Sequence, residues 1–303
     1  MPLWREYAVE PSLFDDYNQA RLILSGFGVD RGRLIAAFPR KWQREVIRQL
    51  SGYTEMQRKT FIEKLNKLDS ILVPRAHPYD GSTSWKEQAF DCDRTEPFHA
   101  IMTNGADARQ KSIDGTGDFE SMPLWQVKGR ESIPRNSKEL AAALNFLLER
   151  CSEILIVDRE FMPSGGTGDK WLKPIQWIGE ILASQGRVRR FELHSLDKPH
   201  AKWPAGKFSN DCTQHLPRVI PKGLSMTAIL WSQRPAGVQF HERLIVTDRG
   251  GVLLDPGIDE GKPGETYDIR LLSGAECDEY FRRFGGSSTS YDLVESIGIR
   301  GAL

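Results

Sequence analysis

A strand, a tight turn and a second strand are predicted by the stretch Phe240-His241-Glu242-Arg243-Leu244-Ile245-Val246-Thr247-Asp248-Arg249-Gly250-Gly251-Val252-Leu253-Leu254-Asp255-Pro256-Gly257-Ile258-Asp259. Apolar residues alternate at Phe240, Leu244 and Val246, which is typical of a strand with one buried face. The glycines that follow Arg249 can supply the positive φ of a hairpin turn. The stretch therefore predicts a β-hairpin.

His241 and Arg243 carry the chemistry of this hairpin. They lie two residues apart, so on one strand both side chains point to the same face. An imidazole beside a fixed cation suits a phosphate site, because one group can attack or transfer a proton while the other holds an oxyanion. The alternative is a partly buried strand histidine that hydrogen-bonds to its neighbour.

Length and charge limit the classes of function. With 303 residues and 39% hydrophobic content, the chain can form one large or two medium domains. The 41 basic and 41 acidic residues balance, so nucleic-acid binding would require a local basic patch. No signal peptide and no apolar run of membrane-spanning length is present. We expect a cytoplasmic protein that does not bind membranes.

The cysteines predict neither a metal site nor a disulfide framework. They are far apart and form no Cys-x-x-Cys or Cys-x-x-His spacing. They are Cys92, Cys151, Cys212 and Cys277. We expect reduced thiols and no cofactor.

Helices alternate with apolar strands in the C-terminal half, which favours an α/β fold. The expected helices span 137–148, 171–184 and 275–284, with a further helical stretch at 211–219. The expected strands span 153–158, 189–194, 225–231 and 266–272, beside the hairpin. The tail after Gly286 is expected at the surface.

The N-terminal part is predicted as a less regular α+β region. Its expected strands span 21–28, 34–38, 71–74, 98–102 and 124–127. Its expected helices span 42–50 and 54–68, a short helix follows Ser84, and residues 104–121 are predicted to form a loop. A polar stretch with a proline at 130–136 predicts the boundary, with domains at 1–135 and 136–303.

The hairpin resembles the signature of the phospholipase D superfamily. That signature is histidine-x-lysine, an aspartate five residues after the lysine, and a later glycine-serine-x-asparagine. This chain has His241, Arg243 and Asp248, followed by Gly257 and Asp259. The resemblance implies a mixed sheet flanked by helices, and a phospho-histidine at His241. Arg243 would hold the phosphate, Asp259 would lie near the asparagine position, and Asp248 would be structural or orient the site.

The chain departs from that signature in three ways. Arg243 replaces lysine, the glycine-serine pair is absent, and Asp259 places an acid where the family has an amide. Two functions therefore stay open. One is a metal-independent nuclease or other phosphodiesterase, in which a homodimer would bring two copies of His241 together. The other is an inactive module that binds nucleic acid or a protein partner. By analogy alone, such folds also suggest prokaryotic antiviral defence.

Other residues are candidates for supporting this site. Asp158 closes the buried strand, where ligands of open α/β sheets lie, although it could equally cap a loop. His200 and Lys202 lie in a proline-flanked basic stretch, and Arg189 and Arg190 form a basic cluster. All four are candidate contacts to phosphate or nucleic acid, and a solvated surface is the alternative.

Two further stretches are notable for their composition. Residues 77–85 gather His, Tyr, Asp, Ser and Trp before a helix, and could bind phosphate or stack on a base. An Asp-Gly turn and a capping box around a core Trp85 is the alternative. Residues 40–44 join Arg40 and Lys41 to Trp42, and could contact a nucleic-acid backbone or form a solvated helix face.

Overall fold

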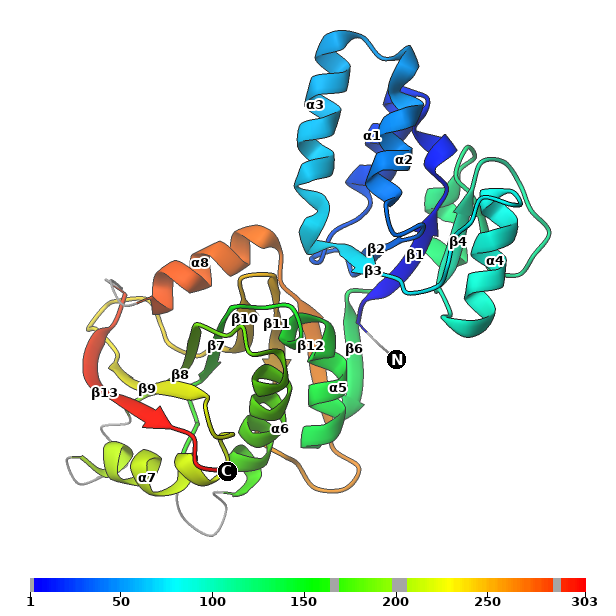
Figure 1. The fold of residues 1–303 in the computed structure, drawn as a ribbon. Helices are drawn as coiled ribbons and strands as arrows, with labels where there is room; N and C mark the ends of the chain where they lie inside the picture. The colour runs from blue at the N-terminus through cyan, green and yellow to red at the C-terminus, as the bar shows by residue number, and fades with distance from the viewer. Residues whose placement is uncertain (1–2, 164–168, 198–205, 286–289) are drawn as a thin grey trace. The chain divides into compact units, whose positions relative to one another are not determined.

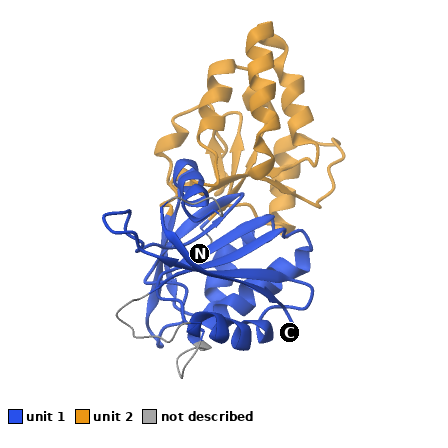
Figure 2. Cartoon of the chain, turned by 90° about the vertical axis from the view of Figure 1, so that its left-hand side faces the viewer, with its two compact units in different colours: residues 1–3, 130–303 blue, residues 4–129 orange. Residues whose placement is uncertain are grey.

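The computed structural model describes residues 3–163, 169–197, 206–285 and 290–303. The chain divides into two compact units, one of residues 4–129 and one of residues 1–3 with 130–303 (Figure 2). Residues 130–134, expected in a linker, form a strand of the second unit. Most of its residues are exposed, because this strand lies at the edge of the sheet. Its sequence is therefore polar and resembles that of a connection.

The first unit, residues 4–129, contains five strands and four helices among its described residues. Its strands are β1 (Arg5–Val9), β2 (Arg33–Ala37), β3 (Leu72–Pro74), β4 (Ala100–Thr103) and β5 (Ser112–Asp114). Its helices are α1 (Tyr17–Ser25), α2 (Trp42–Gln49), α3 (Glu55–Asn66) and α4 (Trp85–Thr95). Figure 1 shows α1, α2 and α3 together and α4 apart from them.

The sheet of this unit is more regular than the sequence indicated. All its strand pairs are parallel, in the order β3-β2-β1-β4-β5, which is that of a doubly wound α/β sheet. The expectation of an irregular α+β region was therefore wrong. Several strands are only three or four residues long, so their periodicity is too short to separate from that of loops.

Three local predictions in this unit were also wrong. Residues 21–28, expected as a strand, belong largely to α1, whose buried Ala20, Ile23 and Leu24 follow helical spacing after the Asp16 cap. The expected loop 104–121 contains β5. The expected strand 124–127 instead includes a 3-10 turn at Pro123–Trp125.

The second unit contains eight strands and four helices among its described residues. Its strands are β6 (Arg130–Pro134), β7 (Glu153–Asp158), β8 (Arg190–Leu196), β9 (Ser225–Ser232), β10 (Arg243–Thr247), β11 (Gly250–Asp255), β12 (Thr266–Leu271) and β13 (Asp292–Arg300). Its helices are α5 (Ser137–Leu148), α6 (Asp169–Gln185), α7 (Lys207–His215) and α8 (Gly274–Phe284). These elements confirm the α/β fold class.

The eight strands form one mixed sheet in the order β13-β9-β8-β7-β10-β11-β12-β6. β7, β8 and β9 are parallel, and the remaining pairs are antiparallel. The tail expected at the surface supplies β13, which pairs with β9 along its length. β13 is exposed over most of its length, so its sequence lacks the apolar pattern of a buried strand.

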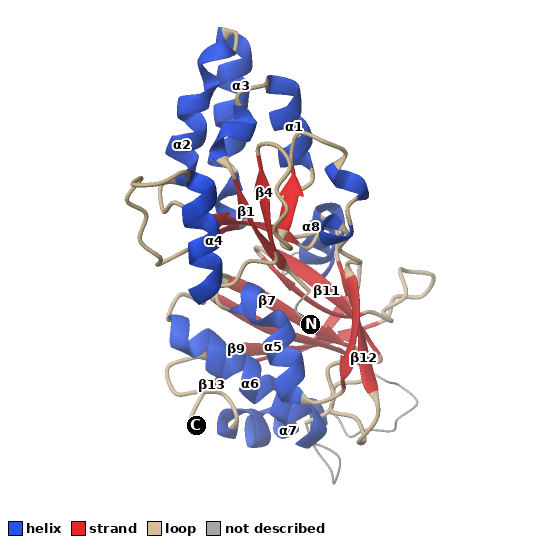
Figure 3. Ribbon diagram, turned by 90° about the vertical axis from the view of Figure 1, so that its right-hand side faces the viewer, coloured by secondary structure: helices blue, strands red, loops and turns tan. Residues whose placement is uncertain are grey.

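Helices lie against both faces of this sheet. Figures 1 and 3 show α5 and α6 side by side, and these helices also contact each other. On the other face, Cys277 and Phe284 of α8 join a buried cluster with Val157, Leu244 and Val246. The central strands are therefore covered on both sides. Polar residues such as Asp158 and Arg243 lie at the ends of these strands. Among the described residues, no helix is both long and apolar enough to cross a membrane.

Candidate functional site

Strand ends and strand starts from distant parts of the chain meet at one edge of the eight-stranded sheet. Asp158 at the end of β7 faces Arg243 at the start of β10. Ser232 at the end of β9 faces Asp292 at the start of β13, and Pro134 at the end of β6 faces Thr266. We call this the carboxyl edge, because the parallel strands β7, β8 and β9 end there. Such an edge is where open α/β sheets bind ligands.

His241 lies at this edge but just outside the strand. β10 begins at Arg243, two residues later than the sequence pattern required for a strand carrying both side chains. Phe240, Leu244 and Val246 are buried in one cluster as the alternation predicted, and His241 is exposed. The expectation of a single buried face was wrong, because Ile245 on the other face of β10 is buried as well. His241 lines a hollow of about 610 Å³ together with Arg159, Leu196, Gln233, residues 234–237, Gln239 and Phe240.

Arg243 is partly buried and poorly satisfied. Its side chain is 29% exposed, and its Nε lies 4.0 Å from Oδ1 of Asp158. This separation is longer than a hydrogen bond, and Nε is buried without a hydrogen-bond partner among the described residues. A buried guanidinium nitrogen with no acceptor is costly, so Arg243 is not fully satisfied within the fold, and the exposed part of its side chain is available to an oxygen supplied by a ligand.

Asp158 closes β7 and is buried beside Arg243. Its Oδ1 accepts from the backbone N–H of Glu160 at 2.9 Å, and its Oδ2 accepts from the backbone N–H of Ile258 at 3.0 Å. Burial raises the pKa of the Asp158 carboxyl, against the opposing effect of these N–H groups and of Arg243. Asp158 therefore joins the end of β7 to the segment after β11 and also caps its own loop.

The raised pKa of Asp158 predicts a pH effect on stability. A carboxyl whose folded pKa lies above its unfolded value stabilises the fold at low pH, and this contribution is lost as the pH rises through the folded pKa. Replacing Asp158 with asparagine should remove the titration. We expect the free energy of unfolding of D158N, relative to the unsubstituted protein, to increase from acid pH towards neutrality. Urea unfolding across that range measures it, and a flat or decreasing difference would contradict the assignment.

Asp259 reaches the same edge but is already paired. Its Oδ1 accepts from Nη2 of Arg135 at 2.5 Å, and its Oδ2 lies 2.9 Å from Nζ of Lys170. These two cations therefore offset the negative charge of Asp259, which would otherwise repel a phosphate bound nearby. They also hold Asp259 in place, so it is a positioning residue for Arg135 and Lys170 and not a free acid.

Gly257 brings three of these side chains together. Its φ of 150° lies in the region that favours glycine. A Cβ at this position would lie 2.7 Å from Oδ2 of Asp158, 3.1 Å from Cδ of Arg243 and 3.2 Å from Oδ1 of Asp259. Arg243, Asp158 and Asp259 therefore lie close together around residue 257, where the missing side chain leaves room for them.

Asp248 lies at the opposite edge of the sheet. It follows the end of β10, and its carboxylate accepts from the backbone N–H groups of Ser152 and Glu153 at 2.8 and 3.1 Å. It also accepts from the Ser152 hydroxyl at 3.0 Å. Of the two roles the resemblance implied, Asp248 has the structural one, because it anchors the start of β7.

The basic cluster at Arg189 and Arg190, a candidate contact to phosphate or nucleic acid, does not lie at the carboxyl edge. β8 begins at Arg190, so the cluster lies at the amino ends of the parallel strands, away from His241. Arg190 donates to Glu192 at 2.8 Å, and Arg189 donates to the Ser152 hydroxyl at 3.1 Å. The direction of β8 in the sheet determines at which edge this cluster lies, and that direction cannot be predicted from a single sequence. His200 and Lys202 lie outside the described residues.

Sequence reasoning missed Glu242. It is 6% exposed, forms an ion pair with Arg283 of α8, and accepts from the backbone N–H of His241 at 3.0 Å. The sequence did contain a signal for Glu242. It alternates with the apolar Phe240 and Leu244, which places its carboxylate on the buried face of the strand, where it requires a partner. Arg135 and Lys170 were also missed, since each lies far from Asp259 in the chain.

Three other cations described near this edge each have a carboxylate partner. Arg159 pairs with Glu160 at 3.0 Å, Arg234 with Asp292 at 2.8 Å, and Lys173 with Glu260 at 3.3 Å. Within the described ranges, no three His, Cys, Asp or Glu residues are grouped so that they could hold a metal ion. Arg243 is therefore a local hydrogen-bond donor for an anion at this edge, where several neighbouring cations are already paired.

Comparisons with known proteins add little to this geometry. No family model matches the chain, and no curated protein matches it by sequence. A solved structure with some similarity is TrmBL2, described as an archaeal chromatin protein that shows a novel mode of DNA binding. It has 10% sequence identity and a TM-score of 0.29, over 81% of this chain and 70% of that chain. This score is too low to indicate a shared fold, so no inference is drawn from it.

Proposed function

We propose that the carboxyl edge of the eight-stranded sheet binds a phosphodiester group of a nucleic acid, without cleaving it in a single chain. The observation that carries the proposal is Arg243, whose side chain is 29% exposed at this edge and whose Nε has no acceptor among the described residues. Its guanidinium is held in place by packing against Gly257 and by the nearby Asp158. A phosphate oxygen would satisfy it in the fork geometry that arginine offers.

The surroundings favour binding over turnover. His241 is exposed at the adjacent hollow and can approach a bound phosphate. Within the described part of the unit, the other histidines are His194, buried in β8, and His215 at the end of α7, so His241 is the one imidazole at this edge. Asp259 is engaged by two cations and Asp158 is buried. Neither Asp158 nor Asp259 is thus free to protonate a leaving oxygen.

Replacing Arg243 with alanine tests the proposal. We expect the affinity for a fluorescent oligonucleotide, measured by anisotropy, to fall about tenfold, because a hydrogen bond to a charged group contributes about 1.5 to 3 kcal/mol. The salt slope of binding should fall by about one. Arg189→Ala removes the same charge at the opposite edge, and should leave both quantities unchanged. Equal affinity of R243A and the unsubstituted protein would reject the site.

A second candidate is a phosphodiesterase that uses His241 as nucleophile. The exposed imidazole without a described side-chain partner is the observation that favours it. The imidazole nitrogen would bond to phosphorus as the ester oxygen leaves, and water would then release the phosphate. The leaving oxygen needs a proton, which the His241 of a second copy could donate. This candidate therefore requires a homodimer.

The same samples separate the two candidates. Under the binding proposal, oligonucleotides stay intact in EDTA at every protein concentration. Cleavage in EDTA that His241→Ala abolishes, and that increases with self-association, would replace it with the phosphodiesterase. Cleavage that survives H241A would reject His241 as the nucleophile.

A further inference from the structure

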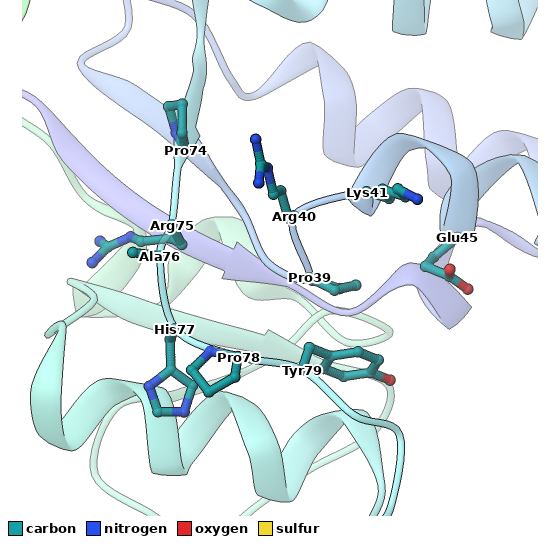
Figure 4. A pocket seen from close by; sticks show the side chains of 10 residues that line it. All are labelled: Pro39, Arg40, Lys41, Glu45, Pro74, Arg75, Ala76, His77, Pro78 and Tyr79. Carbon is teal, nitrogen blue, oxygen red and sulfur yellow. The ribbon is translucent and has the colours of Figure 1, made fainter.

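Two sequence stretches that the edge site does not use meet in the first unit. Residues 39–41 follow β2, and residues 75–79 follow β3. The two strands are parallel neighbours with Ala37 opposite Pro74, so both segments leave the sheet at the same edge. They enclose a pocket of about 740 Å³ (Figure 4). Its size and its place beyond the carboxyl ends of parallel strands are those of a small-molecule site.

One wall of this pocket is cationic. Figure 4 shows Arg40 and Lys41 on one side of it. Both side chains are exposed, and neither pairs with a carboxylate among the described residues. Glu45, the acid in the lining, is bound to Arg48 at 2.8 Å, which offsets its charge. This wall therefore presents two cations to an anion.

Arg75 also lines the pocket but has a different role. It is bound by Glu6, lies 3.6 Å from Glu96 and places its guanidinium 4.6 Å from the centre of the Phe98 ring. These contacts pair its positive charge within the fold, although its buried Nε has no hydrogen-bond partner among the described residues. Arg75 thus braces the segment after β3, and Arg40 and Lys41 supply the free positive charge.

The opposite wall consists of two rings and a proline. It is formed by His77, Pro78 and Tyr79 (Figure 4). The Tyr79 ring meets the buried Phe38 ring edge to face at 5.6 Å, which orients it while leaving it 37% exposed. His77 is held through its Nδ1, 3.2 Å from the Thr95 hydroxyl. Rings and prolines of this kind offer a surface on which a planar group can stack.

We propose that this pocket binds a free nucleotide, with its phosphate on Arg40 and Lys41 and its base against Tyr79. A ligand that is anionic at one end and planar at the other matches both walls. The start of α2 adds N–H groups to the cationic side, because its first turn has no side-chain cap. The pocket lies wholly within the first unit, so this proposal is independent of the edge site.

Calorimetric titration of the full chain tests the proposal. The probes are AMP, GMP, CMP, UMP and ATP, together with inorganic pyrophosphate and a short single-stranded oligonucleotide. We expect one-to-one binding of at least one nucleotide. Arg40→Ala with Lys41→Ala should weaken it about a hundredfold, since each of the two charged contacts accounts for about tenfold. Tyr79→Leu should weaken nucleotide binding and leave pyrophosphate binding unchanged.

Two controls isolate the pocket. Arg58→Ala with Lys59→Ala removes the same charge from exposed positions of α3 outside the lining, and should not change nucleotide binding. Arg243→Ala should not change it either, which separates this proposal from the edge site. Failure of every nucleotide to bind, equal affinity of the Arg40 and Lys41 variant, equal binding of pyrophosphate and nucleotides, or binding of the oligonucleotide alone would each overturn the proposal.

Discussion

Replacing Arg283 with alanine is expected to lower the free energy of unfolding by about 3 to 5 kcal/mol. Arg283 extends from α8 to Glu242, which is 6% exposed and lies on the core face of the hairpin with Phe240 and Leu244. Removing the cation leaves a buried carboxylate with no opposite charge, and that costs far more than an exposed ion pair contributes. Urea unfolding at neutral pH measures the loss.

The neighbouring residue provides the control. Arg282 is exposed on the same turn of α8, and R282A removes the same charge without touching Glu242. We expect its unfolding free energy to change by less than about 0.5 kcal/mol. Replacing both members of the pair, as Glu242→Gln with Arg283→Met, should recover much of the loss in R283A, because no unpaired charge is left. A loss in R283A no larger than that in R282A would show that Glu242 does not depend on its partner.

Replacing Gly257 with alanine is expected to destabilise the protein by about 3 kcal/mol or more, from two separate causes. A positive φ costs about 1 to 3 kcal/mol when the residue has a side chain. The new Cβ would also lie 2.7 Å from Oδ2 of Asp158, and overpacking of a closely packed site costs about 1 to 3 kcal/mol. Because the displaced atoms belong to Asp158, Arg243 and Asp259, oligonucleotide affinity should fall with stability.

Gly264 separates the two causes. It lies in the same connection between β11 and β12 and has a φ of 93°, and a Cβ added there would meet no described atom within 4 Å. Gly264→Ala therefore carries the backbone cost alone. We expect G264A to lose less stability than G257A and to keep its oligonucleotide affinity. Equal losses in the two variants would show that the contact with Asp158 is not critical.

Local features of the fold could be predicted from neighbouring residues. Thr54 and Ser84 accept from the backbone three residues on and begin α3 and α4, as their sequence context predicts. The run from Ile154 to Val157 is fully buried in β7. The tight turn after Thr247 joins β10 to β11. Each of these features depends on groups that lie only a few residues apart in the chain. Hydrophobic periodicity and capping residues are therefore enough to predict them.

Two other local predictions were only partly right or wrong. The alternation at Phe240, Leu244 and Val246 holds, yet β10 begins only at Arg243. The apolar run in α1 was interpreted as a strand because its continuous character hides the helical spacing of its three buried residues. A continuous apolar run fits both the helical period of about 3.6 residues and the strand period of two. Which of the two structures forms depends on the surface against which the run packs.

The α/β class and most helices and central strands could be predicted from the sequence, which also named His241, Arg243, Asp158 and Asp259 as candidate site residues. Which charges meet depends on the tertiary structure. Arg135 and Lys170 reach Asp259 across long chain separations, and Arg283 reaches Glu242 from another element. Residues 39–41 and 75–79 likewise join in one pocket. The physical reason is that strand order and direction place the ends of strands together, and these are properties of the whole sheet.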